Sequence, residues 1–149
     1  MFPITPFSLL LTNLTISAIL CGLIWTIQLV HYPSFLDVGP DQYVVFQQNH
    51  MKNISILVIP LMLLELGAGI YLQLEHLKEN IHWLIYVASL LLLIIWVVTM
   101  FVASPLHGKL ASQGYDKKGI QQLVNINWIR TVAWTLRTAI FFFLVWRYS

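Results

Sequence analysis

The stretch ISILVIPLMLLELGAGIYLQL, residues 54 to 74, is almost entirely apolar and carries one charged residue, Glu65, near its centre. A helix needs about 20 predominantly apolar residues to cross the hydrocarbon core of a bilayer. An ionisable side chain at the centre of such a helix costs at least ~2.5–3.5 kcal/mol, so it faces the interior of a bundle and a partner there. The stretch therefore predicts a transmembrane helix that packs against other helices.

Three further apolar blocks occupy residues 9–30, 83–103 and 126–146. The chain of 149 residues is 58% apolar and 9% charged, whereas soluble domains have roughly 45–50% apolar and about 25% charged residues. We expect an all-α integral membrane protein: a single domain, residues 1–149, that forms an antiparallel bundle of four transmembrane helices in the lipid bilayer. A formal net charge of +2 without a basic cluster argues against nucleic acid as a partner.

The connections between the blocks predict the orientation. We call side A the end of the bundle with the connections 32–52 and 105–124, and side B the opposite end. Cytoplasmic loops carry the excess of Lys and Arg, which places side A in the cytoplasm and both termini outside. The basic residues counted are Lys52, Lys109, Lys117 and Lys118 on side A, and Lys78 and Arg147 on side B.

Proline and acidic residues indicate where the helices begin and end. Tyr32-Pro33 predicts the end of the first helix, because a residue before proline is disfavoured in the helical region. Pro40 predicts the start of the second helix, and Pro105 predicts an interruption of the third. Asp116 is expected to cap the start of the fourth.

Arg137 is a second ionisable residue near the centre of a predicted helix. Glu65 and Arg137 each lie about 13 residues, or about 20 Å of helix, from side A. Their matching depths predict a buried ion pair. Such a pair can fix the register of the helices, or it can take part in substrate or proton handling, and both interpretations stay open.

Polar residues recur at helical spacing within the blocks. Gln28 and His31 share a face of the first helix, and Tyr43 and His50 share a face of the second. On the fourth helix, spacings of three, four and three place a polar stripe on one face. Because this stripe contains two arginines, we expect it to look into the bundle. Its members are Asn127, Arg130, Trp134 and Arg137.

The expected topology brings four polar residues together at side A, and we predict them as catalytic residues: His31, His50, His107 and Arg130. The three imidazoles are candidate ligands for a divalent transition metal, and two of them for haem. A cofactor-free site is a third alternative. A fourth is that each histidine is only an interfacial hydrogen-bonding residue.

The remaining two histidines, His76 and His82, lie near charged residues in the side B connection. We expect both of them to be solvated. Neither belongs to the candidate site.

Three tryptophans lie one to two helical turns in from side A and predict the wall of an intramembrane cavity below the histidines. Packed or lipid-facing tryptophan is the alternative. Such a cavity suits a flat apolar ligand such as a quinone, a porphyrin or a polycyclic phenol. The predicted ligand-binding residues are these tryptophans and their polar neighbours: Trp25, Trp96, Trp134, Gln28, Tyr43 and Asn127.

Four segments of the chain together resemble a group of small four-helix bacterial integral membrane proteins, which implies a bacterial plasma membrane. The segments are VHYPSF (30–35), FQQNHMKNISILVIPLMLLELGAG (46–69), SPLHGKLASQGYD (104–116) and LVNINWIRTVAWTLR (123–137). More distantly, the size and layout are similar to the anthrone-oxygenase-like membrane family. That similarity implies dioxygen-dependent oxidation of an activated phenolic ring, with or without a bound metal. It implies no residue roles, because no motif corresponds position by position.

Three functions remain open. The leading one is a redox or oxygenase-type enzyme acting on an apolar ligand, with histidine as acid, base or ligand and Arg130 stabilising a developing oxyanion or phenolate. The second is a proton-linked transporter or permeation subunit that uses Glu65 and Arg137 and, with only four spans, works as a homo-oligomer. The third is a non-catalytic membrane assembly subunit whose polar residues only hold the helices in register.

Overall fold

The computed structural model describes residues 5–79 and 82–149, and the regular elements in these ranges are helical. The all-α prediction is confirmed. The elements are α1 (Pro6–Thr26), the π-helical turn η1 (Ile27–His31), the 3-10 turn η2 (Pro33–Asp37), α2 (Pro40–Glu79), α3 (Leu84–Val98), the π-helical turn η3 (Thr99–Ala103), α4 (Ser104–Gln113) and α5 (Lys117–Tyr148).

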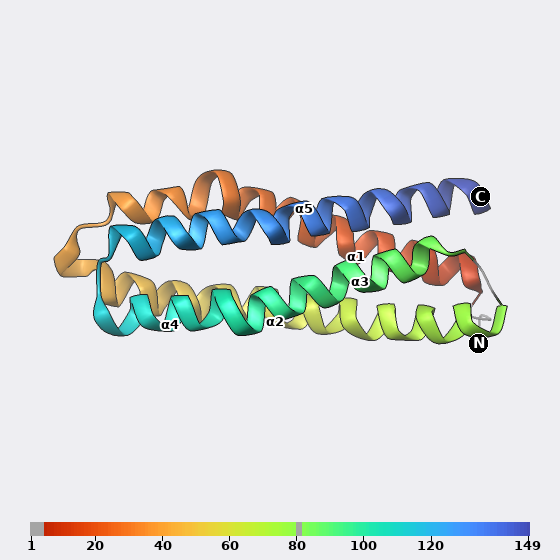
Figure 1. Ribbon diagram of the computed structural model, residues 1–149, viewed down its shortest axis with the longest axis horizontal. Helices are drawn as coiled ribbons and strands as arrows, with labels where there is room; N and C mark the ends of the chain where they lie inside the picture. Colours follow the sequence, from red (N-terminus) through yellow and green to blue (C-terminus); the bar gives the residue numbers. More distant parts are fainter. Residues whose placement is uncertain (1–4, 80–81) are drawn as a thin grey trace.

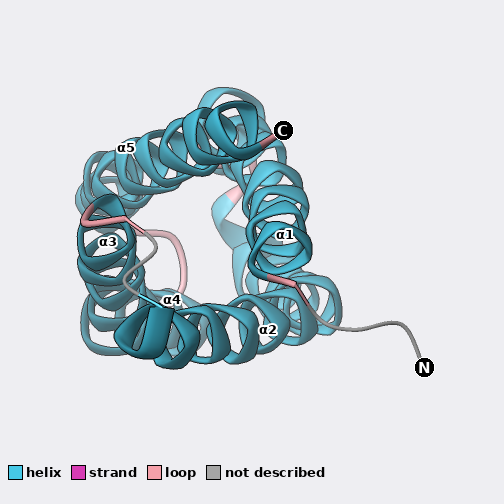
Figure 2. Ribbon diagram, turned by 90° about the vertical axis from the view of Figure 1, so that its right-hand side faces the viewer, coloured by secondary structure: helices cyan, strands magenta, loops and turns pink. Residues whose placement is uncertain are grey.

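These elements form four long columns, and the chain passes back and forth along the long axis of the molecule (Figure 1). The turns η1 and η2 prolong α1, and η3 and α4 prolong α3. Seen end-on, the columns surround a common centre (Figure 2). Both α1 and α3 pack against α2 and α5, so α1 and α3 lie diagonally across the bundle.

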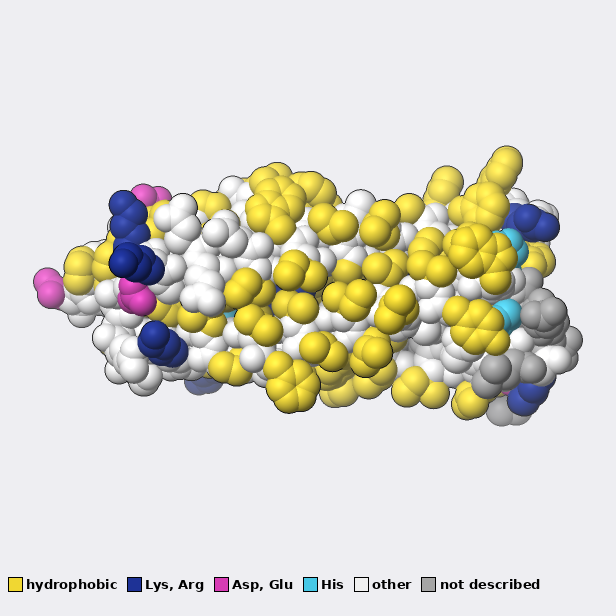
Figure 3. Space-filling model, in the orientation of Figure 1, with side chains coloured by type: hydrophobic (Ala, Val, Ile, Leu, Met, Phe, Trp, Pro, Cys, Tyr) yellow, Lys and Arg dark blue, Asp and Glu magenta, His cyan; other side chains and the backbone are white. Residues whose placement is uncertain are grey.

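The four columns are long and apolar enough to cross a membrane, over residues 6–37, 40–76, 84–113 and 117–148. Large apolar side chains are exposed around the middle of the molecule, whereas charged side chains gather at its two ends (Figure 3). The exposed apolar residues include Ile56, Leu63, Phe101 and Phe142. An outer surface of this kind suits a hydrocarbon environment better than water.

The first column does not end at Tyr32-Pro33, contrary to the expectation. Tyr32 keeps helical dihedral angles, with φ −68° and ψ −40°. The α-helix instead widens before it: the amide of Tyr32 donates to the carbonyl of Ile27 at 2.9 Å, five residues back. Pro33 then opens the 3-10 turn η2, where its missing N–H would have no helical partner in any case.

The third column likewise continues past Pro105 rather than being interrupted there. A second π-helical turn precedes it, closed by a bond from the amide of Ser104 to the carbonyl of Thr99. Pro105 lies in the first turn of α4. Asp116 caps α5 as predicted, because its side chain accepts from the amide of Lys118 at 3.0 Å.

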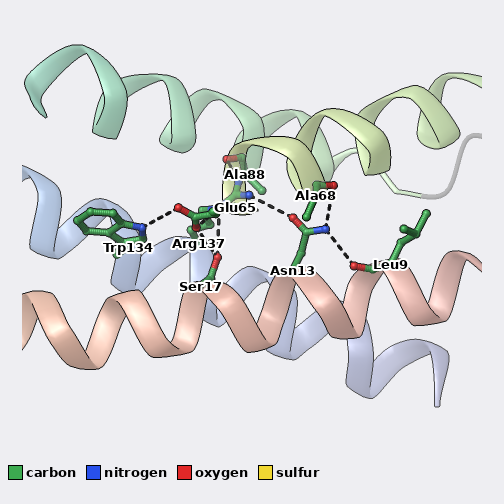
Figure 4. A network of polar contacts seen from close by, with 8 residues as sticks. All are labelled: Leu9, Asn13, Ser17, Glu65, Ala68, Ala88, Trp134 and Arg137. Carbon is green, nitrogen blue, oxygen red and sulfur yellow. Dashed lines mark hydrogen bonds and ion pairs between the residues drawn. The ribbon is translucent and has the colours of Figure 1, made fainter. Parts of the chain in front are cut away.

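The predicted Glu65–Arg137 ion pair is present and buried (Figure 4). Arg137 Nε lies 3.0 Å from Glu65 Oε1, and the exposed fractions of the two side chains are 1% and 0%. Ser17 of α1 donates to the same oxygen at 2.7 Å, and the indole of Trp134 donates to Oε2 at 3.0 Å. Both carboxylate oxygens therefore have partners.

The remaining donors of Arg137 reach two further groups. Nη1 donates to the carbonyl of Ala88 in α3, and Nη2 donates to Asn13 Oδ1 in α1 at 3.3 Å. Asn13 in turn donates to the carbonyl of Ala68 in α2 at 3.1 Å. All four columns are thus connected through one buried network, which sets their relative height along the bundle.

Gly69 makes room for this network. A Cβ atom at this position would lie 3.0 Å from Leu92 Cδ2 and 3.2 Å from Arg137 Nη2. Gly67, on the other hand, has open space around its Cα. Gly69 is therefore the position where α2 needs a small residue to approach its neighbours.

His76 is buried at the side B end, and the expectation that it is solvated is wrong. Its exposed fraction is 1%, because its ring packs edge-on against Tyr86 at 4.7 Å between centroids. Its Nδ1 also accepts from the amide of His82 at 3.3 Å. His82 itself is only partly exposed.

Removing one member of the ion pair leaves the other charge buried without its counter-ion. We expect Glu65→Met and Arg137→Met each to lower the free energy of unfolding by about 3–5 kcal/mol. The measurement is unfolding of the purified protein in a mild detergent. The double variant should lose clearly less than the sum of the single losses, because it buries no charge. Additive losses would contradict the pair as the unit that holds the columns together.

Candidate functional site

A cavity of about 180 Å³ lies between the columns, on the side A flank of the ion pair. Most of its wall is aliphatic and comes from α1 and α2, with Leu20, Ile24, Val58 and Met62 among the lining residues. The wall becomes polar toward side A. The polar part contains Tyr32, His50, His107 and Arg130.

The cavity is open on one side. Ile59 lines it and is also 53% exposed on the apolar outer surface. The cavity therefore opens on the apolar outer surface of the bundle.

Both π-helical turns adjoin this cavity. Ile27 of η1 and Thr99 and Ala103 of η3 are part of its lining. A π-helical turn closes its hydrogen bond over five residues instead of four, and such turns are frequent at functional sites. The two widened turns immediately precede the segments that carry Tyr32 and His107.

His31 and His50 are in direct hydrogen-bond contact. His31 Nε2 lies 2.8 Å from His50 Nδ1, so one proton is shared between these two nitrogens. The other nitrogen of His50, Nε2, is buried and has no hydrogen-bond partner among the described residues. A buried polar atom without a partner costs about 1–3 kcal/mol. The His50 ring lines the cavity, and no described protein group occupies its Nε2.

His107 lies next to His50, at 5.3 Å between ring centroids, and is held on both sides. Its Nδ1 is 2.7 Å from Gln47 Nε2, and its Nε2 is 2.8 Å from the Tyr32 hydroxyl oxygen. Since the amide nitrogen of Gln47 can only donate, Nδ1 accepts and Nε2 carries the proton. The hydroxyl proton of Tyr32 is then left for an acceptor elsewhere, and Tyr32 lines the cavity.

Arg130 brings a positive charge to the cavity wall. Its side chain is 8% exposed. It donates to Asn127 Oδ1 from Nε at 3.1 Å and from Nη2 at 2.6 Å, and to Thr99 Oγ1 from Nη1 at 3.4 Å. All of these partners are neutral, and across residues 5–79 and 82–149 no carboxylate forms an ion pair with Arg130. Its charge is therefore not compensated by the protein.

Gln28 and Asn127 do not line the cavity, although both were predicted to bind the ligand. Gln28 Oε1 accepts from Asn127 Nδ2 at 2.8 Å, and Gln28 Nε2 donates to the carbonyl of Val124 at 3.2 Å. These bonds orient the Asn127 amide so that its oxygen faces Arg130. The two residues position the arginine instead of contacting a ligand.

Of the three deep tryptophans, only Trp134 lines the cavity. Trp25 is 36% exposed, because its ring lies on the outer surface, where it packs edge-on against Trp128 and donates to Thr135 Oγ1 at 3.0 Å. Trp96 lines a different groove, between α2 and α3. The predicted aromatic wall is therefore mostly aliphatic.

Tyr43 is also outside the cavity. It is buried near side A, where its ring packs edge-on against Tyr115 at 5.5 Å between centroids. It precedes His50 by about two turns of α2. Tyr43 therefore lies closer to side A than the polar end of the cavity does. Its role is in the packing of α2 against the start of α5.

The three imidazoles do not fit a metal site or a bis-histidine haem. Ligands of one metal must direct unprotonated nitrogens at a common point about 2.0–2.1 Å away. His31 and His50 instead bond to each other, and both nitrogens of His107 bond to Gln47 and Tyr32. Within the described ranges, no group of three His, Cys, Asp or Glu residues could hold a metal ion. A porphyrin likewise has no space between rings in direct contact.

Two residues of the site, Tyr32 and Thr99, were not anticipated. Tyr32 lies four residues after Gln28, so the two residues share a face if the helix continues to Tyr32. Because we expected the helix to stop at Tyr32-Pro33, Tyr32 was not assigned to that face. Thr99 is a hydroxyl residue inside the apolar block 83–103. Its polarity was the available signal, and its bond to Arg130 depends on the π-helical turn that begins there.

Comparison of the chain with protein-family models, with curated proteins and with solved structures finds no match. The function must therefore be argued from the chemistry of the cavity. Its two distinctive groups are an arginine without an acidic partner and a histidine nitrogen without a hydrogen-bond partner.

Arg130 and Arg137 offer a matched comparison of two buried arginines on one helix. We expect Arg130→Met to change the free energy of unfolding by less than about 1 kcal/mol, against a loss of about 3–5 kcal/mol for Arg137→Met. Only Arg137 has a buried carboxylate that would be left unpaired. The measurement is unfolding of both variants in the same detergent. Equal losses would mean that Arg130 is needed for folding and would remove the reason to assign it to a ligand.

Proposed function

We propose that the chain is an integral protein of a bacterial plasma membrane, with its columns crossing the lipid as an antiparallel bundle. The length and apolar composition of the four columns support this proposal, as does the separation of apolar and charged side chains along the molecule. The four lysines in the side A connections, against two basic residues at side B, favour side A in the cytoplasm.

For the cavity, we propose an amphipathic ligand with a phenolic or quinol oxygen. Two observations carry this proposal: Arg130 has no ion-pair partner among the described residues, and His50 Nε2 has no hydrogen-bond partner among them. Both residues line the same, mostly apolar cavity. A phenolate oxygen would accept from both groups, and its apolar ring would lie against the aliphatic wall. Neither a metal nor a haem on these histidines is needed to bind such a molecule.

The size of the cavity narrows the ligand class. About 180 Å³ is less than the roughly 300–1,000 Å³ of most small-molecule pockets. One aromatic ring fits this space, whereas a porphyrin does not. An alkyl tail would leave through the open side at Ile59 and lie in the lipid.

As the reaction, we propose oxidation of this phenol or quinol by dioxygen, in a redox or oxygenase-type enzyme. Arg130 would stabilise the phenolate, which loses an electron more readily than the neutral phenol does, and His50 would exchange the phenolic proton. The layout shared with the anthrone-oxygenase-like family supports the same chemistry.

The Glu65–Arg137 pair does not favour proton-linked transport. Each carboxylate oxygen already accepts from Ser17, Trp134 or Arg137, and the pair is buried away from the cavity lining. These contacts favour the interpretation that the pair fixes the register of the helices. The assembly-subunit alternative predicts no ligand in the cavity and is tested by the binding experiment below.

Binding can be tested with an alkyl nitrophenol, which quenches tryptophan fluorescence and is largely ionised at neutral pH. We expect saturable quenching that is mostly lost in Trp134→Phe and retained in the matched control Trp96→Phe. Arg130→Met should weaken binding about 10- to 100-fold, because a hydrogen bond to a charged group contributes about 1.5–3 kcal/mol. The methyl ether of the probe should show no such dependence on Arg130. Absence of quenching in the unmodified protein would favour the assembly subunit.

The reaction can be tested by oxygen uptake in proteoliposomes supplied with single-ring alkyl phenols or quinols. We expect uptake that is strongly reduced in Arg130→Met and His50→Ala and unchanged in His82→Ala, which lies at side B. Binding of these molecules without any oxygen uptake would limit the function to ligand binding.

A further inference from the structure

A second hollow lies on the outer surface at side A, directly beside the cavity. Its volume is about 430 Å³, and two exposed amides, Asn49 and Asn53, lie in its otherwise largely apolar lining. His50 lines both this outer hollow and the inner cavity. Ile54 lines both spaces as well, so the two hollows adjoin each other across His50 and Ile54. The complete lining of the outer hollow is His31, Phe46, Asn49, His50, Asn53 and Ile54.

The two histidines form a continuous line of nitrogens from the hollow to the cavity. His31 is half-buried at the hollow, and its Nε2 bonds to His50 Nδ1 at 2.8 Å. The line ends at His50 Nε2, which has no partner among the described residues and belongs to a ring that lines the cavity. Phe35 packs edge-on against both rings, at 5.2 Å from His31 and 4.9 Å from His50 between centroids, and is fully buried. This packing holds the two rings in place and opposes a water path beside them.

We propose that His31 and His50 form a proton relay between the outer hollow and the ligand oxygen in the cavity. This proposal rests on the proposed function, since the ligand oxygen is its inner end. His50 Nε2–H transfers its proton to a phenolate oxygen, His50 Nδ1 takes the proton from His31 Nε2, and His31 Nδ1 takes one from water in the hollow. One proton moves inward in total, and no electron is transferred.

The relay returns to its starting state when a proton moves the other way. After the inward transfer, His50 carries its proton on Nδ1, and its bare Nε2 can accept a proton from a phenolic hydroxyl. The same steps in reverse then deliver a proton to the hollow. A reaction that deprotonates its substrate and later reprotonates its product therefore restores both tautomers without rotation of either ring.

The surroundings of the relay keep it neutral and separate from the third histidine. His50 is buried, and burial disfavours an imidazolium because a charged ring loses its hydration there. His107 cannot replace His31, because both of its nitrogens bond to Tyr32 and Gln47. The path thus depends on His31 and His50.

The test uses the nitrophenol probe bound to the full-length protein, with the loss of nitrophenolate absorbance after a rapid drop in pH as the readout. His31→Gln keeps an amide donor for His50 but cannot relay a proton, and His31 does not line the cavity. We expect the protonation rate of the bound probe to fall about 10²-fold with little change in its dissociation constant. Imidazole added to the buffer should restore the rate in His31→Ala, where the ring is missing, and not in His31→Gln. His82→Ala is the control with an unchanged rate.

The possible outcomes separate the relay from the ligand site. An unchanged protonation rate in His31→Gln, with the probe still bound, overturns the relay and leaves the proposed function standing. Failure of the unmodified protein to bind the probe overturns both. A measurement without any variant is the coupling between His31 Nε2 and His50 Nδ1 across their hydrogen bond in ¹⁵N-histidine-labelled protein. Detection of this coupling supports the relay, and its absence overturns it.

Discussion

The buried ion pair between Glu65 and Arg137 is the constraint on which the arrangement of the columns depends. In the membrane proposed above, apolar side chains would not distinguish one helix height from another, because the hydrocarbon is as apolar as they are. Two buried charges that must pair fix the axial position of one helix relative to the other. Trp134 links the ion pair to the cavity, because its indole donates to Glu65 and its ring is part of the cavity lining.

The two buried arginines of α5 serve opposite purposes on the same face of one helix. Arg137 meets a carboxylate and has its donors occupied by all the other columns. Arg130, seven residues earlier, donates to neutral oxygens among the described residues and lines an open cavity. The charge of Arg137 is neutralised by a carboxylate within the protein, whereas the charge of Arg130 has no carboxylate partner among the described residues. The contrast between them identifies the site more clearly than the histidines alone.

Much of the architecture could be predicted from the sequence, and the reasons are physical. Blocks of apolar residues predict helices, and two ionisable residues at equal depth predict a pair. The direction of Trp25 and Trp96 could not be predicted, because an apolar ring is equally stable against lipid and against another helix. The place of Tyr32 in the cavity lining could not be predicted either, because proline usually ends a helix. Here the chain forms a π-helical turn before Tyr32 and continues as a 3-10 turn from Pro33. The burial of His76 depends on a ring contact with Tyr86 from the next helix.

The π-helical turns make the number of residues in the columns as important as their identity. Each α-helical residue advances the helix by about 100°, so the extra residue in η1 rotates Tyr32 and everything after it relative to α1. The same holds for η3 and His107. Loss of one residue from 27–31 or 99–103 would leave an ordinary, well-formed helix and turn the polar end of the cavity away from its apolar floor. The cavity is therefore a property of helical phase as much as of side chains.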